Sequence, residues 1–360
     1  MSVIYILLTL LIFSVLVVVH EAGHFAVAKL NGVLVEEFAV GMGPIVFSKS
    51  IGDTLYSVRA FPLGGFCRML GEDDDSSDSR SFNNKGVFAR IAVVFTGPLM
   101  NFIFAFIAVF IVAATAQAVA VPVVGEVLED SNAYNQGLEK GDRIIKINNE
   151  AIHTYQDLFF TLDGTNGKEL SVVVKRDGQK YKLAITPVLN EDKTGYIIGF
   201  RPVVKTGLFA DEVDGYEKTS FAETVKDSFY TLTFYVKSVV VGFVRLFTLK
   251  ISPSEVAGPI GIVQVVGDTV ETGMTYSLLS VIKSLLTLSA LLSVNLGVIN
   301  LFPIPAMDGG RLVFLFIEAL RGKPFDREKE GMVHFIGFVL LIMFMFLVAS
   351  NDIFRIFSGR

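Results

Sequence analysis

Long apolar runs constrain the fold of this chain more than any other feature. A bilayer-spanning helix needs about 20 apolar residues, and four segments meet that need: about 3–30, 87–121, 277–301 and 332–349. Hydrophobic residues make up 52% of the 360-residue chain. Because lipid offers no partner for backbone N–H and C=O groups, such runs are predicted to be helices. We therefore predict an α-helical multi-pass membrane protein with about four transmembrane helices.

The positive charges between these runs predict the orientation in the membrane. No Lys or Arg precedes Lys29, so the first run lacks the basic start of a cleavable signal peptide and is expected to remain as a span. Basic residues gather in 29–90 and 311–329, which are expected to be cytoplasmic. Segment 122–220 and both termini are then expected outside. The net charge of −5 suggests no nucleic-acid partner, and a single cysteine excludes an intrachain disulfide framework.

Composition divides the chain into four parts. Residues 1–121 contain the first two membrane helices and, at 33–70, a loop rich in Gly, Pro and short β patterns, predicted to be membrane-associated. Residues 122–202 are predicted to form an inserted extracytoplasmic domain, mainly β with short helices. Residues 203–276 are predicted to be a linker, with an amphipathic, interfacial helix at about 221–246. Residues 277–360 hold the last two membrane helices.

The first apolar run ends in His20-Glu21-Ala22-Gly23-His24. On a helix, residues four apart share a face, so the two imidazoles can bind one metal ion, and Glu21 can act as a general base toward its water. Chance accounts poorly for this pattern, because ionisable groups in a membrane helix are costly without a function. From Val3 to His20 the helix rises roughly 26 Å, which places the motif toward the cytoplasmic side. The isolated His153 and His334 are predicted to be structural.

A catalytic zinc site needs a third protein ligand and an open position for water. Asp308 is the best candidate, because it follows Pro303 and Pro305, which break the helix, and precedes two glycines. Broken backbone at membrane depth is tolerated where it is buried or lines a cavity. A respectable alternative is that Asp308 caps the helix that begins near Arg311. Combined with the histidine pair, the ligand interpretation is favoured.

Together these motifs resemble the site-2 proteases of the bacterial regulator-of-sigma-E protease type. The resemblance is carried, in order along nearly the whole chain, by six strings: 20–24; Pro62-Leu63-Gly64-Gly65-Phe66 with Met69-Leu70-Gly71-Glu72; Gly97-Pro98-Leu99-Met100-Asn101; the PDZ-like 137–148; Gly258-Pro259-Ile260-Gly261-Ile262; and 300–310. It implies one Zn²⁺ held by His20, His24 and Asp308, with Glu21 as base, in a bacterial inner membrane. The chain has one PDZ-like unit, whereas the best-known relatives carry two.

The resemblance also implies a substrate, namely a membrane-spanning protein that another (site-1) protease has already trimmed. Substrate contacts are expected at Asn300 and Pro303 and along the β-rich loop, at Leu55, Val58, Gly64 and Gly65. We expect the strand from about Leu55 to Phe61 to clamp an unwound substrate by strand addition. The PDZ-like domain either binds a peptide or chain end or acts as a steric cap. Residues 258–262 form either a tight packing turn or part of a substrate entrance.

Three functions compete at this stage. The first is an intramembrane zinc endopeptidase of single-span proteins, such as anti-sigma factors or remnant signal peptides. The second is a membrane-bound PDZ scaffold without catalysis, for which Glu21 and zinc would be irrelevant. The third is a transporter, suggested by broken helices at membrane depth, although we find no inverted repeat. The ligand set and the base together favour the peptidase.

Overall fold

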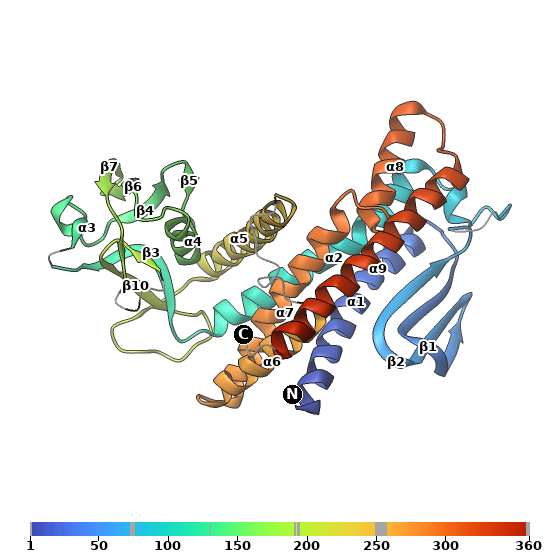
Figure 1. Ribbon diagram of the computed structural model, residues 1–360, viewed down its shortest axis with the longest axis horizontal. Coiled ribbons are helices and arrows are strands. Elements are labelled where there is room, and N and C mark those ends of the chain that lie inside the picture. Colours follow the sequence, from blue (N-terminus) through green and yellow to red (C-terminus); the bar gives the residue numbers. More distant parts are fainter. Residues whose placement is uncertain are drawn as a thin grey trace. The chain divides into compact units, whose positions relative to one another are not determined.

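The computed structural model describes residues 2–72, 76–129, 131–190, 192, 195–248 and 258–357, so residues 249–257 of the expected linker lie outside the described chain. The chain divides into two compact units. One unit combines residues 1–108 with 236–360, and the other is Val109–Tyr235. Figure 1 gives the elements of both.

Helices dominate the first unit. They are α1 (Val3–Leu30), α2 (Val87–Thr115, which runs on into the second unit), α5 (Phe221–Phe247, which begins there), α6 (Pro259–Met274), α7 (Leu278–Leu301), α8 (Asp308–Arg321) and α9 (Arg327–Phe357), with a short 3₁₀ turn at Phe82–Asn84. In the described chain five helices are long and apolar enough to cross a membrane: α1, α2, α5, α7 and Glu328–Asp352 of α9.

The chain is thus a multi-pass membrane protein by helix length and composition. The four expected spans are among the five helices, and α5 is the fifth. Its placement at the membrane interface stays a prediction, because length and composition alone do not distinguish a span from an interfacial helix.

Glycines let the helices of this unit approach closely, as is usual where lipid offers no hydrophobic driving force between helices. A side chain at Gly23 of α1 would run into the Thr96 carbonyl of α2. A Cβ at Gly297 of α7 would lie 3.1 Å from the Phe102 ring of α2. These glycines therefore fix where α1, α2 and α7 meet.

Residues 258–262 form the start of α6. Gly258 is the N-cap, and the buried Asp352 of α9 accepts the backbone N–H groups of Gly258, Ile260 and Gly261 at 2.9–3.1 Å. A Cβ at Gly258 would lie 2.6 Å from Asp352 Oδ2. Close packing therefore accounts for the glycine at 258, and an entrance role of this segment stays a prediction.

The predicted β-rich loop at 33–70 is a hairpin of β1 (Val35–Ile51) and β2 (Thr54–Met69). Both strands bend, so residues 55–58 pair with 47–50 on one side and with 37–40 on the other, while 65–69 pair with 35–40. Positive φ angles at Gly41, Gly43 and Gly64 permit the bends. The hairpin thus becomes a small curled sheet whose free edges are 45–51 and 65–69.

This register corrects one expectation. Leu55 and Val58 lie in the interior of the curled sheet, because each pairs with a residue on both sides. A strand that is already paired on both sides has no free N–H and C=O groups to offer a substrate. Strand addition at 55–58 is therefore ruled out by this pairing, whereas a clamp at the rest of the predicted strand, 59–61, stays a prediction.

The second unit is mainly β with two short helices, α3 (Asn132–Asn135) and α4 (Tyr155–Asp163). Its sheet runs in the order β11-β10-β3-β4-β6-β7, with β5 beside β4 and a separate β8–β9 pair. The strands are β3 (Val119–Val127), β4 (Arg143–Ile147), β5 (Glu150–Ala151), β6 (Leu170–Arg176), β7 (Gln179–Ile185), β8 (Val188–Leu189), β9 (Tyr196–Ile197), β10 (Phe200–Thr206) and β11 (Glu217–Lys218). The regular strands start before residue 122 and end after 202.

Alternation along β6 explains why this unit folds. Leu170, Val172 and Val174 are buried and face the same side of the strand, where they join one cluster with Ile144 and Ile147 of β4. Where α4 begins, Thr154 and Asp157 form a reciprocal capping box. That this unit is a PDZ domain stays a prediction.

Candidate metal centre

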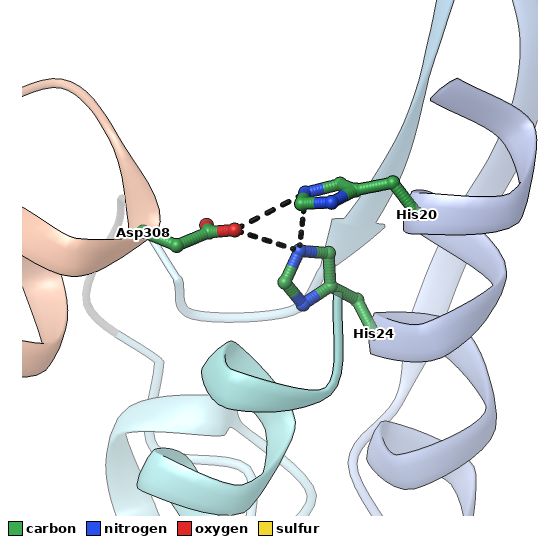
Figure 2. A group of neighbouring side chains, drawn as sticks. All are labelled: His20, His24 and Asp308. Carbon is green, nitrogen blue, oxygen red and sulfur yellow. Dashed lines mark hydrogen bonds and ion pairs between the residues drawn. The ribbon is translucent and has the colours of Figure 1, made fainter. Parts of the chain in front are cut away.

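Three predicted ligands from two distant segments meet in the helical unit. His20 and His24 lie one turn apart on α1, both 8% exposed, with their Nε2 atoms 3.1 Å apart. Asp308, at the start of α8, directs Oδ2 between them, 3.1 Å from His20 Nε2 and 3.4 Å from His24 Nε2. Figure 2 shows the three side chains converging on one point. In the described residues this is the group of His, Cys, Asp and Glu suited to a metal ion.

The spacing of these atoms fits zinc. Bonds of 2.0–2.1 Å in a tetrahedral site set the ligand atoms about 3.3 Å apart, close to the 3.1, 3.1 and 3.4 Å observed. The donor chemistry agrees as well. Within the described chain, Asp308 Oδ2 is buried and lacks a hydrogen-bond partner, so a cation is the natural partner for the lone pairs directed at this point.

The break between α7 and α8 brings Asp308 to the histidines. Helix α7 ends at Leu301, two residues before Pro303, and α8 begins at Asp308 with Met307 as its N-cap. Asp308 is therefore the first helical residue and Met307 is the N-cap, so the alternative that Asp308 caps this helix is wrong. Its carboxylate is left free for the histidines.

Glycines make the turn between the two helices possible. A side chain at Gly309 would run into the carbonyl of Phe302, and a Cβ at Gly310 would lie 2.6 Å from the carbonyl oxygen of Ile304. Ala306 has a positive φ of 73°, and its N–H donates to Nδ1 of His334 at 2.8 Å. His334 thus has the structural role expected of it, because it holds the break in shape.

Glu21 projects toward the curled sheet. Its Oε2 accepts the backbone N–H of Cys67 at 3.0 Å. Cys67 lies on the free edge 65–69, so the edge of the sheet passes beside the proposed base. One carboxylate oxygen is oriented by this bond, and the other can take a proton. No pattern in the sequence indicates this contact, because a backbone N–H group is common to almost all residues.

Helix α2 contacts both histidines through Gly97 and Asn101, which the sequence analysis named only as part of a motif, and through Val93, which it did not name. A side chain at Gly97 would overlap His24 and would lie 2.9 Å from His20 Cε1. The carbonyl oxygen of Val93 lies 2.9 Å from His24 Nδ1. The amide of Asn101 lies beside His20. The spacing of these residues, four apart, was the available signal.

The remaining predicted residues are placed as follows. Asn300 is in the last turn of α7 and Pro303 in the break that follows, on the segment leading to Asp308. Gly64 and Gly65 stand at the start of the edge 65–69. His153, expected to be structural, stacks on Tyr230 in the second unit with ring centroids 4.0 Å apart.

A possible metal-ligand triad, with a carboxylate beside it at the end of an apolar helix, is the arrangement expected of a membrane metalloprotease. Comparison with known families agrees: residues 8–344 match the model of Peptidase family M50. The chain belongs to this family, that of the site-2 proteases, and is a zinc metalloprotease.

Named relatives match nearly the whole chain. It is 31% identical to the zinc metalloprotease RasP of Geobacillus kaustophilus, over 97% of each chain. It is 30% identical to the regulator of sigma-W protease RasP of Bacillus subtilis, over 97% of this chain and 98% of that one. A solved PDZ domain of an SdrC-like protein from Listeria monocytogenes matches 23% of this chain and 88% of that one, at 21% identity. Its TM-score of 0.21 does not establish a common fold.

Proposed function

We propose that this protein is an intramembrane endopeptidase that cuts the membrane-spanning segments of single-span proteins. One observation carries the proposal: three metal-ligand atoms lie 3.1–3.4 Å apart near the end of a 28-residue apolar helix. A hydrolytic site at that depth suits a substrate that is itself in lipid.

In this proposal His20, His24 and Asp308 hold the zinc ion. When bound, zinc supplies Lewis acidity, which activates water as a nucleophile and polarises a peptide carbonyl. Glu21 takes the proton from the attacking water and passes it to the leaving amine. The hydrogen bond from Cys67 N–H to Glu21 Oε2 keeps the carboxylate aimed during both transfers.

A helical substrate must unwind before its carbonyls can react, and each unpaired backbone group then costs several kcal/mol in lipid. We place the replacement partners on the edge 65–69, at residues other than Cys67, whose N–H is bonded to Glu21 and so marks the side of this edge that faces the base. An unwound segment added to this edge would lie beside the base. Gly64 and Gly65 then remain candidates for backbone contact with the substrate, while Leu55 and Val58 remain candidates for side-chain contact only. Asn300 and Pro303 are proposed to contact the substrate on the side opposite the edge 65–69.

The name of one relative supports a proposal for the biological substrate. One of them is named for regulating sigma-W, which supports an anti-sigma factor, or a remnant signal peptide, as the substrate class here. In this proposal the protein acts in regulated intramembrane proteolysis in a bacterial plasma membrane, after a site-1 protease has cut the substrate. Its termini and second unit face outside, and the active site lies toward the cytoplasm. The second unit is proposed to be a PDZ domain that binds the trimmed chain end.

The decisive experiment co-expresses candidate single-span proteins with the wild type, with Glu21→Gln, and with Glu36→Gln as a control, since Glu36 is exposed. We expect product from the wild type and the control, and a loss of at least about 100-fold in Glu21→Gln. Purified Glu21→Gln should retain zinc, because Glu21 is not a ligand. Chelation should stop cleavage by the wild type. Equal product from all three proteins would support a non-catalytic scaffold instead.

A further inference from the structure

One face of α2 is built against the two histidines. Val93, Gly97 and Asn101 are spaced four apart and therefore lie on one face of the helix. Their spacing matches that of His20 and His24 on α1. The backbone of Val93 meets one ring, and the side chain of Asn101 meets the other. Gly97 between them leaves the room that the imidazoles occupy.

His24 has a defined tautomer in this arrangement. Its Nδ1 lies 2.9 Å from the carbonyl oxygen of Val93. A carbonyl can only accept, so Nδ1 carries the proton and the lone pair is on Nε2, the atom directed at the other ligands. This is the usual support of a ligating histidine, whose second ring nitrogen donates to an oxygen.

His20 needs the same support, and Asn101 is in position to give it. Asn101 is fully buried, with its amide nitrogen Nδ2 placed 3.2 Å from His20 Nδ1. Within the described chain its Oδ1 is buried and has no hydrogen-bond partner. The two ends of an amide are nearly isosteric, so the proton on the neighbouring group decides which end faces it. In either orientation of the Asn101 amide one end lacks a hydrogen-bond partner, so the protonation of His20 decides which orientation is adopted.

The choice follows from the role of His20. With Nδ2 donating to Nδ1, the neutral ring carries its proton on Nε2 and has no lone pair for a metal. With Oδ1 accepting from Nδ1–H, the Nε2 lone pair is free and points to Asp308 and His24. Metal binding at Nε2 therefore requires the amide oxygen toward His20.

We propose that Asn101 is a positioning residue whose amide oxygen accepts the Nδ1–H of His20 and fixes the Nε2 lone pair on the metal. The inference rests on the proposed role of His20 as a zinc ligand. A second contact holds Asn101 in place: the buried hydroxyl of Ser293 on α7 donates to its backbone carbonyl at 2.8 Å. The helices α2 and α7 thus determine where the Asn101 amide lies, and the amide in turn determines which nitrogen of the His20 ring carries the proton.

Zinc affinity tests the proposal without relying on activity. Full-length Asn101→Leu keeps the shape of the side chain but cannot accept a hydrogen bond, whereas Asn101→Asp can accept from Nδ1–H. Both would be purified in detergent and equilibrated with zinc against a chelator of known affinity. We expect zinc binding 10- to 100-fold weaker in Asn101→Leu, the usual cost of losing such support. We expect Asn101→Asp to stay short of that 10-fold loss or to bind zinc more tightly than the wild type.

Two further measurements separate positioning from simple packing. The first is the melting temperature without zinc, which a packing role would lower in Asn101→Leu and a positioning role leaves near that of the wild type. The second is Ser293→Ala, which removes the backbone anchor and should weaken zinc binding less than Asn101→Leu does.

The outcomes are distinguishable from failure of the proposed site. His20→Ala should lose zinc; if it binds zinc like the wild type, His20 is not a ligand and the proposed site fails. If His20→Ala loses zinc while Asn101→Leu keeps wild-type affinity, only the role of Asn101 is overturned. Equal weakening in Asn101→Leu and Asn101→Asp would also overturn it. If Asn101→Leu does not fold, Asn101→Ala takes its place with the same expectations.

Discussion

Replacing Gly97 by alanine should disable the metal centre while leaving α2, the helix that contains Gly97, intact. The added Cβ would lie 2.9 Å from His20 Cε1 and still closer to His24 Nε2. Ordinary contacts of a Cβ are 3.4–4 Å, so the rings must withdraw by roughly 1 Å. A zinc–nitrogen bond of 2.0–2.1 Å tolerates about 0.2 Å. We therefore expect zinc binding to fall and cleavage to drop by about 100-fold, the usual cost of such a misplacement.

Gly242→Ala is the matched control. Gly242 also lies within a helix, α5, but a Cβ there would meet nothing within 4 Å. Alanine in place of glycine inside a helix generally gains about 1 kcal/mol, so both variants should fold at least as well as the wild type by that criterion. The assay measures zinc content by mass spectrometry and substrate cleavage under single-turnover conditions. Full zinc content and wild-type cleavage in Gly97→Ala would refute the reasoning.

Two other predictions concern the edge of the sheet and the second unit. The first uses a Glu21→Gln, Cys67→Ser background and a substrate that carries one cysteine. The substrate should form a disulfide with Arg68→Cys at the edge 65–69 and little disulfide with Val58→Cys, although the side chains at both positions are exposed. Equal disulfide yields would contradict strand addition at 65–69. Burial alone would raise the pKa of Asp142, but hydrogen bonds from Arg176 and from Glu139 N–H, with the Arg176 charge, hold it below its usual value. A carboxyl with a lowered folded pKa stabilises above its unfolded pKa of about 3.9, and this contribution is lost as the pH falls through the folded pKa. Hydrogen exchange in 119–206 should therefore show Asp142→Asn destabilised by about 2 to 3 kcal/mol at pH 7 and less sensitive to acid than the wild type; parallel pH profiles would contradict this.

The sequence by itself determined the features that depend on local pattern. Apolar length predicted the four helices, because a spanning helix must satisfy its own backbone. The i, i+4 spacing predicted that His20 and His24 share a face, since helical periodicity is local. Glycine and proline around Asp308 predicted the break, and short β-rich runs separated by Gly and Pro predicted the β-rich loop at 33–70.

Tertiary structure decided everything that depends on which segments meet. That residues 55–58 are interior and 65–69 form an edge depends on how a bent hairpin folds back on itself, which short patterns do not specify. The contact of Cys67 N–H with Glu21 involves a backbone group common to almost all residues. The union of Asp308 with the histidines, and of Asn101 with His20, joins residues 288 and 81 positions apart. The sequence supplied the chemical groups, and the packing of α1, α2 and α8 decided that they share one point.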